Sequence, residues 1–160
     1  MTGLPQAAFL LSIVGLSVSL AGFTGLVAAL RRGAAWKPMD SYRLRQIPEM
    51  ALATGFIALS TIPLADTTGS ASVTIRIAGG VGLLFVIANA LVLIERARSM
   101  NVRVSGIDGV LAGTVNLVSI AVAVAALVAP TSATLEWLLA LLIARPGLAF
   151  LLALSDLMPE

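Results

Sequence analysis

Few side chains in this chain could do chemistry, and they stand in long apolar stretches. The chain has 160 residues and contains neither Cys nor His. Disulfides, thiolate chemistry, the commonest metal ligand and the usual general base are therefore excluded. Arg145 stands out because it lies in the middle of an apolar segment. A charge inside a membrane segment is costly, faces the protein interior and is a functional candidate.

Two amides share this apolar setting and could meet Arg145. At about 1.5 Å per residue, Arg145 and Asn116 lie roughly 14 Å from the inner ends of their predicted spans, and Asn89 roughly 8 Å. Asn116 is therefore the expected partner. The three residues form a candidate intramembrane polar site that could attract an anion. In the alternative, Arg145 bonds only carbonyls freed by Pro146, or snorkels to the interface.

Two carboxylates, Glu49 and Asp108, invite a catalytic or ion-binding interpretation. Both are predicted in the first turn of a helix, with the second helix opening at Ile47 and Pro48. A carboxylate there complements the helix dipole, which is the simpler explanation. Without Cys or His, acid–base chemistry would depend on these two residues alone. We therefore expect no enzyme, no catalytic residue, no cofactor and no metal site.

The elements that hold these residues are predicted from composition. The sequence is 59% hydrophobic and 11% charged, with a mean hydropathy of +1.03. Soluble domains are about 45–50% apolar and about 25% charged. We expect an all-α integral membrane bundle, with residues 1–160 as one membrane domain and the lipid bilayer as its first partner. The net charge of +2 comes from basic clusters beside predicted spans. Such clusters indicate topology and not nucleic-acid binding.

Five transmembrane helices are predicted from the apolar segments. Their approximate bounds are 6–30, 47–65, 75–94, 107–129 and 135–154. The last holds Arg145 and Pro146, yet its Leu, Ile and Phe residues contribute about −5 kcal/mol to insertion against about +3 for the Arg. The alternative is four spans plus a C-terminal re-entrant hairpin, which must be surrounded by protein or water.

Basic residues set the predicted orientation. Two loops, 31–46 and 95–106, hold eight of the ten basic residues. The positive-inside rule places both loops in the cytoplasm of a bacterial inner membrane, with the N-terminus outside and the C-terminus cytoplasmic. Tyr42 is expected at headgroup level. The loops could also bind another membrane or cytoplasmic protein. Their basic residues are Arg31, Arg32, Lys37, Arg43, Arg45, Arg96, Arg98 and Arg103.

Small residues recur at helical spacing and predict helix contacts. They let helix backbones approach closely in lipid. The stripes pack either inside the bundle or between subunits, and the second alternative predicts a homo-oligomer. The candidate interface residues are Ser12, Gly15, Ser19, Gly22, Gly109 and Gly113.

One run resembles a known group. The residues 19–27 (SLAGFTGLV), followed by Arg31-Arg32, Trp36, Asp40 and Arg43-Leu44-Arg45, resemble a group of small, uncharacterised bacterial inner-membrane proteins. The resemblance covers residues 12–64. It implies a multi-spanning inner-membrane protein and no particular activity.

Two functions fit these expectations. An oligomeric channel or pore-like protein is favoured by the small-residue stripes and by the polar residues at depth. A non-catalytic membrane scaffold, or a partner subunit of a larger complex, is the alternative, favoured by the small size and the absence of motifs. Proton coupling is disfavoured because no carboxylate or His is predicted in the middle of the membrane.

Overall fold

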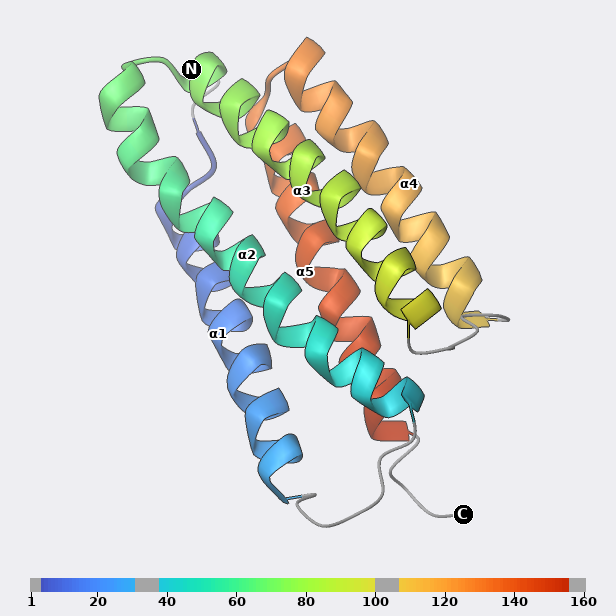
Figure 1. Cartoon of the computed structure of the whole chain (residues 1–160). Coiled ribbons are helices and arrows are strands. Elements are labelled where there is room, and N and C mark those ends of the chain that lie inside the picture. The colour runs from blue at the N-terminus through green and yellow to red at the C-terminus, as the bar shows by residue number, and fades with distance from the viewer. Residues whose placement is uncertain (1–3, 31–37, 100–106, 156–160) are drawn as a thin grey trace.

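The computed structural model describes residues 4–30, 38–99 and 107–155, and this part of the chain is 94% helical without strands (Figure 1). All five helices are long and apolar enough to cross a membrane, which confirms the all-α membrane bundle. In chain order the helices are α1 (Ala7–Leu30), α2 (Pro38–Thr68), α3 (Ala71–Ser99), α4 (Ile107–Val128) and α5 (Ser132–Ser155).

The fifth segment is one continuous helix, so the re-entrant alternative is wrong. α5 runs through Arg145 and Pro146 without a break. Proline removes a backbone donor and frees the carbonyl four residues earlier. Close packing of α5 against its neighbours offsets that loss. Its inward face is almost completely buried, and it includes Leu135, Leu138, Leu139, Leu142 and Pro146.

The second helix begins nine residues earlier than predicted from its apolar segment. Pro38 occupies the first helical position, where its missing N–H is not needed, and Pro48 lies in the interior. The apolar length fixes only the part of a helix inside lipid, and a polar segment can continue it. Four basic residues assigned to loops therefore lie on α2 or α3, namely Arg43, Arg45, Arg96 and Arg98.

The connections at the other end of the bundle are short and defined by local chemistry. Gly69 has a φ of 62°, a left-handed conformation that ends α2. At the start of α5, the Thr134 N–H donates to the Thr131 hydroxyl at 3.2 Å, and the Thr131 N–H donates to the Thr134 hydroxyl at 3.1 Å. This reciprocal arrangement satisfies free donors as a capping box does.

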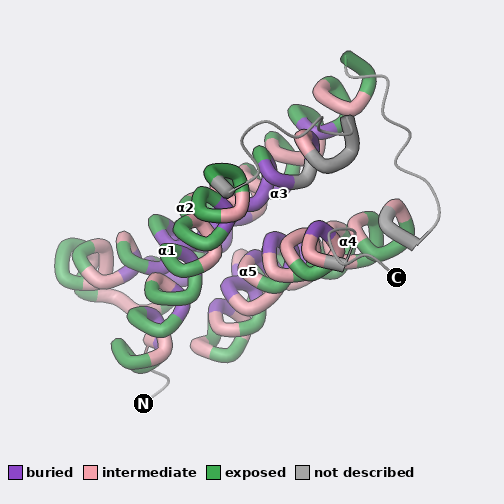
Figure 2. The backbone as a smooth tube through the Cα atoms, turned by 90° about the horizontal axis from the view of Figure 1, so that it is seen from below, coloured by how far each residue is buried: buried purple, intermediate pink, exposed green. Residues whose placement is uncertain are grey.

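The five helices alternate in direction and form two layers. α1, α2 and α3 make one layer, and α4 and α5 make the other, with the buried residues between them (Figures 1 and 2). α5 contacts each of the other four helices. We call the end where α3 finishes and α2 begins the basic end, because Arg45, Arg96 and Arg98 lie there.

Close packing seals the half of the bundle away from the basic end. A Cβ added to Gly79 would lie 2.9 Å from the Ala126 Cβ, and one added to Gly82 would lie 2.9 Å from Leu138 Cδ2. Ala126 and Leu138 are fully buried. Glycine therefore lets α3 approach α4 and α5 closely, as small residues do in membranes. We call these four residues the sealed seam.

Candidate functional site

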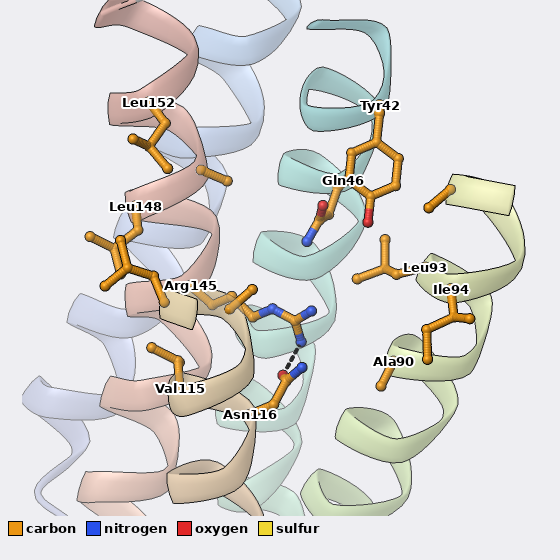
Figure 3. A pocket seen from close by; sticks show the side chains of 14 residues that line it. Tyr42, Gln46, Ala90, Leu93, Ile94, Val115, Asn116, Arg145, Leu148 and Leu152 are labelled. Atoms are coloured by element: carbon orange, nitrogen blue, oxygen red, sulfur yellow. Dashed lines mark hydrogen bonds between the residues drawn. The ribbon is translucent and has the colours of Figure 1, made fainter. Parts of the chain in front are cut away.

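A pocket opens between α2, α3, α4 and α5 in the half of the bundle that carries the basic end. Its volume is about 220 Å³. Ala, Leu, Ile and Val side chains form most of its wall, and the four polar lining residues are Tyr42, Gln46, Asn116 and Arg145 (Figure 3). Along α5 the lining runs from Arg145 to Leu152, a rise of about 10 Å. The pocket, which we also call the chamber, is therefore mainly apolar and contains four polar side chains.

Arg145 supplies the charge of this pocket. Its side chain is only 9% exposed, and its Nη1 donates to Oδ1 of Asn116, which is the contact expected from their matching depths (Figure 3). Its Nε is buried and has no hydrogen-bond partner among the described residues. No Asp or Glu is among the described residues that line the pocket. Among the described residues, the guanidinium is therefore a buried cation without a carboxylate beside it.

Two further polar residues of the pocket, Tyr42 and Gln46, were missed by the sequence analysis. Both are buried inside the protein. Tyr42 lies two residues before the candidate span Leu44–Thr68, and its place at headgroup level stays a prediction. Tyr42 and Gln46 are four residues apart and share one face of α2 because the helix begins at Pro38. If the second helix had been predicted to include the polar residues before Ile47, the four-residue spacing of Tyr42 and Gln46 would have indicated that they share a helix face. The Tyr42 hydroxyl points into the chamber, as Figure 3 shows.

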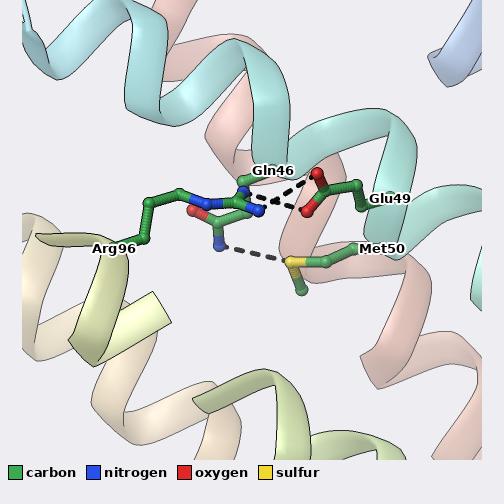
Figure 4. Close-up of polar contacts among 4 residues, drawn as sticks. All are labelled: Gln46, Glu49, Met50 and Arg96. Carbon is green, nitrogen blue, oxygen red and sulfur yellow. Dashed lines mark hydrogen bonds and ion pairs between the residues drawn. The ribbon is translucent and has the colours of Figure 1, made fainter. Parts of the chain in front are cut away.

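The chemistry of Tyr42 and Gln46 adds hydrogen-bonding groups to the chamber. Burial raises the pKa of Tyr42, while the positive charges of Arg145 and Arg96 act in the opposite direction. The phenol therefore stays protonated near neutral pH and can donate. Gln46 Nε2 lies 3.2 Å from the Met50 sulfur, which leaves its carbonyl oxygen as an acceptor (Figure 4).

Asn89, the third predicted polar residue, is not brought into the Arg145–Asn116 pair. It is half-buried on the same helix face as Gly82 and Val86. It does not line the pocket, and its Nδ2 is buried without a hydrogen-bond partner among the described residues. The predicted set of three therefore separates into a pair in the pocket and an amide outside it.

Glu49 has a different role from the predicted one. It lies in the interior of α2 and not in its first turn, so it does not act as a helix-start charge. Instead it accepts two hydrogen bonds from Arg96 of α3, at 2.9 and 3.2 Å (Figure 4). Glu49 is half exposed and Arg96 less so. This ion pair joins α2 to α3 beside the pocket. The side chain of Asp108 lies outside the described residues.

The small-residue stripe on α1 takes no part in packing among the described residues. α1 packs through a different face, which includes Leu10, Ile13 and the fully buried Ser17. The positions where Gly15 and Gly22 would carry a Cβ have no atom within 4 Å. The outward stripe consists of the exposed residues Ser12, Gly15, Ser19 and Gly22. On α4, Gly113 is also exposed with free space around it, and Gly109 is partly buried.

The basic residues are only partly described. Arg31, Arg32, Lys37 and Arg103, and the side chain of Arg43, lie outside the described residues. Of the others, Arg45 and Arg98 are exposed, and Arg96 is paired with Glu49. These exposed charges stand at the end of the bundle nearest the pocket. The exposed carboxylate of Glu95 stands at the same end, so the described charges there carry both signs.

Taken together, the pocket offers a cation and several donors within an apolar wall. Within the described residues, no three His, Cys, Asp or Glu side chains gather to hold a metal ion. The groups present suit the binding of a negative charge by hydrogen bonds and charge attraction. Comparison with protein-family models, with characterised proteins and with solved structures gave no match.

Proposed function

We propose that this protein is an anion-selective membrane transport protein of the channel or pore-like kind. The observation that carries the proposal is the guanidinium of Arg145, buried in a membrane-spanning helix and facing a pocket whose described lining holds no carboxylate. A buried charge without an opposite charge is costly, and such residues mark ion and substrate pathways. An anion in the pocket would complete the charge balance.

The proposed route begins at the basic end, which we place in the cytoplasm. The basic bias of the sequence supports this orientation. Single cysteines test it, because the natural chain has none. Ser72→Cys and Ser99→Cys are a matched pair, since both are exposed and stand at opposite ends of α3. A membrane-impermeant thiol reagent added to intact cells should label only the first. Labelling of Ser99→Cys alone would reverse the orientation.

Ion flux into proteoliposomes tests the proposed activity directly. The protein should carry anions in preference to cations, and Arg145→Leu should reduce this flux at least tenfold. Arg98→Leu is the control, because it removes the same charge from an exposed site at the basic end. The proposal fails if Arg145→Leu and the natural protein carry anions equally, or if the natural protein carries none.

Assembly into a homo-oligomer forms part of the proposal. The helices pack closely at the sealed seam, so a conducting path through the bundle would need either movement there or a space between subunits. The outward stripe of small residues on α1 supports the second route, because such stripes let helices from different subunits approach closely. Replacing Gly15 and Gly22 by Leu should dissociate the oligomer. Unchanged cross-linking in that variant would show that the stripe simply faces lipid.

The same exposed stripe also supports the second candidate function, a non-catalytic subunit that binds another membrane protein. The two candidates differ in what the purified protein does alone. A defined ring in mild detergent, with anion flux after reconstitution, supports the channel. A monomer without flux supports the partner subunit.

A further inference from the structure

The pocket has the chemistry of a binding site for one kind of anion. We infer that it binds a small organic monocarboxylate, with the carboxylate on Arg145 and Asn116 and an apolar body against the aliphatic wall. This inference rests on the proposed anion transport and names its substrate class. It is carried by the charge, the donor arrangement, the wall and the size of the chamber.

The charge of the site fits one negative charge. Arg145 is the only charged residue among the described residues that line the pocket, and it is nine-tenths buried. A guanidinium keeps its proton in proteins, so it cannot become neutral to escape burial. A monovalent anion balances it, whereas a divalent anion would leave one charge uncompensated in a medium of low dielectric constant.

The donors of the site suit a carboxylate group. Nη1 of Arg145 donates to Asn116, and Nη2 donates no hydrogen bond to a described residue. The Asn116 amide nitrogen and the Tyr42 hydroxyl are further possible donors in the same chamber (Figure 3). A carboxylate has two oxygens that accept several hydrogen bonds, and it binds guanidinium strongly. A carboxylate can therefore both balance the charge of Arg145 and accept hydrogen bonds from the surrounding donors.

The wall of the site favours an organic anion over an inorganic one. The chamber is lined by aliphatic side chains such as Leu93, Val115, Leu148 and Leu152. A hydrated inorganic ion gains little from such a wall. An apolar body displaces water from it and gains the free energy of apolar burial.

The size of the chamber suits a small anion. A volume of about 220 Å³ is below the usual range of about 300–1,000 Å³ for drug-sized ligands. A single ring or a short branched chain is a suitable body. A phospholipid with two acyl chains is too large to enter, although its phosphate could offer similar charge at the entrance.

Benzoate is the probe that tests the inference, with benzamide as its neutral counterpart of similar shape. Binding to the full-length protein in mild detergent is measured by calorimetry. Benzoate should bind, and benzamide should bind at least tenfold more weakly because it lacks the charge that Arg145 recognises. Equal binding of the two would overturn the inference. Binding of phthalate, the dianion, as tightly as benzoate would overturn it as well.

Two pairs of variants locate the site. Arg145→Leu should weaken benzoate binding about ten- to hundredfold, the loss expected for a charge-assisted hydrogen bond, while Arg98→Leu should not change it. Ala149→Leu fills the pocket from its apolar side and leaves Arg145 in place. Ala144→Leu, on the exposed face of the same helix, is its control. Benzoate binding that survives Ala149→Leu unchanged would overturn the inference even if Arg145→Leu fails to fold.

Further measurements distinguish a carboxylate site from a site for an inorganic ion or a lipid headgroup. They also distinguish failure of this inference from failure of the proposed anion transport. Chloride that displaces benzoate at equal concentration would identify an inorganic-ion site and overturn the inference, while anion flux could still support the proposed function. Displacement of benzoate by phosphatidylglycerol, but not by phosphatidylcholine, would assign the site to a lipid headgroup and also overturn it. Benzoate binding without any flux would support the inference and refute anion transport.

Discussion

The two halves of the bundle use small residues and polar residues in opposite ways. At the sealed seam, Gly79 and Gly82 bring α3 against Ala126 and Leu138, and no room is left for a Cβ at either glycine. Around the pocket, α2 and α3 are joined by the Glu49–Arg96 ion pair, and α4 and α5 by the Arg145–Asn116 bond, with a chamber between them. Close backbone contact closes one half, whereas side-chain bonds hold the other half without filling it.

This difference suggests that the seam contributes most to stability and that the pocket half is the place for the proposed binding site. Helix association in lipid depends on van der Waals contact, which the seam provides. Each hydrogen bond across membrane helices contributes little, so the polar half is the weaker one. We therefore place the proposed anion site in the half whose helices are joined by side-chain bonds. Substitutions at the seam should therefore change stability, and substitutions at the pocket should change binding.

The largest effect on stability is expected at the seam. Gly79→Leu places a side chain against Ala126, which is fully buried and cannot move aside. The free energy of unfolding should fall by about 3 kcal/mol, the upper part of the range for overpacked cores. Gly113→Leu is the matched control, because the space around Gly113 is open. Unfolding in sodium dodecyl sulfate titrations measures both. Equal losses in the two variants would show that the seam has no special role.

Removing the buried charge should have a smaller effect, and of opposite sign. Arg145→Leu replaces a nearly buried cation by an apolar side chain of the kind that surrounds it. Stability should rise by about 1–2 kcal/mol, as when other buried charged groups are replaced by apolar residues. The same titration measures it. A clear loss of stability would mean that Arg145 holds the bundle together, and that its role is structural.

Asn116→Ala should have a mild effect on stability. It removes the acceptor of the Arg145 bond, and hydrogen bonds between membrane helices average about 0.6 kcal/mol. We expect a loss of about this size, together with weaker benzoate binding in calorimetry. A loss of about 3 kcal/mol or more would show that the pocket is held as firmly as the seam, contrary to the comparison.

The smallest effect is expected for the ion pair beside the pocket. Glu49 is half exposed, so Glu49→Gln should lower stability by no more than about 0.5 kcal/mol. Whatever effect is seen should shrink as the salt concentration rises, because salt screens exposed charges. The titration repeated at two ionic strengths checks this. A large effect that is independent of salt would place the pair in a buried environment.

Much of the fold could be predicted because lipid simplifies the problem. An apolar segment of about 20 residues without charges must cross the membrane as a helix, so composition predicts the number of helices and their type. The Arg145–Asn116 contact could be predicted for a related reason. The distance of each residue from the inner end of its predicted span follows from the fixed rise of a helix, and the two distances are equal. A buried guanidinium also requires a hydrogen-bond acceptor, which Asn116 provides.

The chain by itself thus determined the membrane class, the five helices and the matching positions of Arg145 and Asn116 along their helices. Only the tertiary structure decided which face of each helix points inward. α1 is apolar all around, so its sequence distinguishes no buried face, and its contact with α2 turned the small-residue stripe outward. The pocket depends on the extension of α2 beyond its apolar part, which brings Tyr42 and Gln46 to Arg145. Such rotations and extensions arise from packing between helices, and hydropathy does not record them.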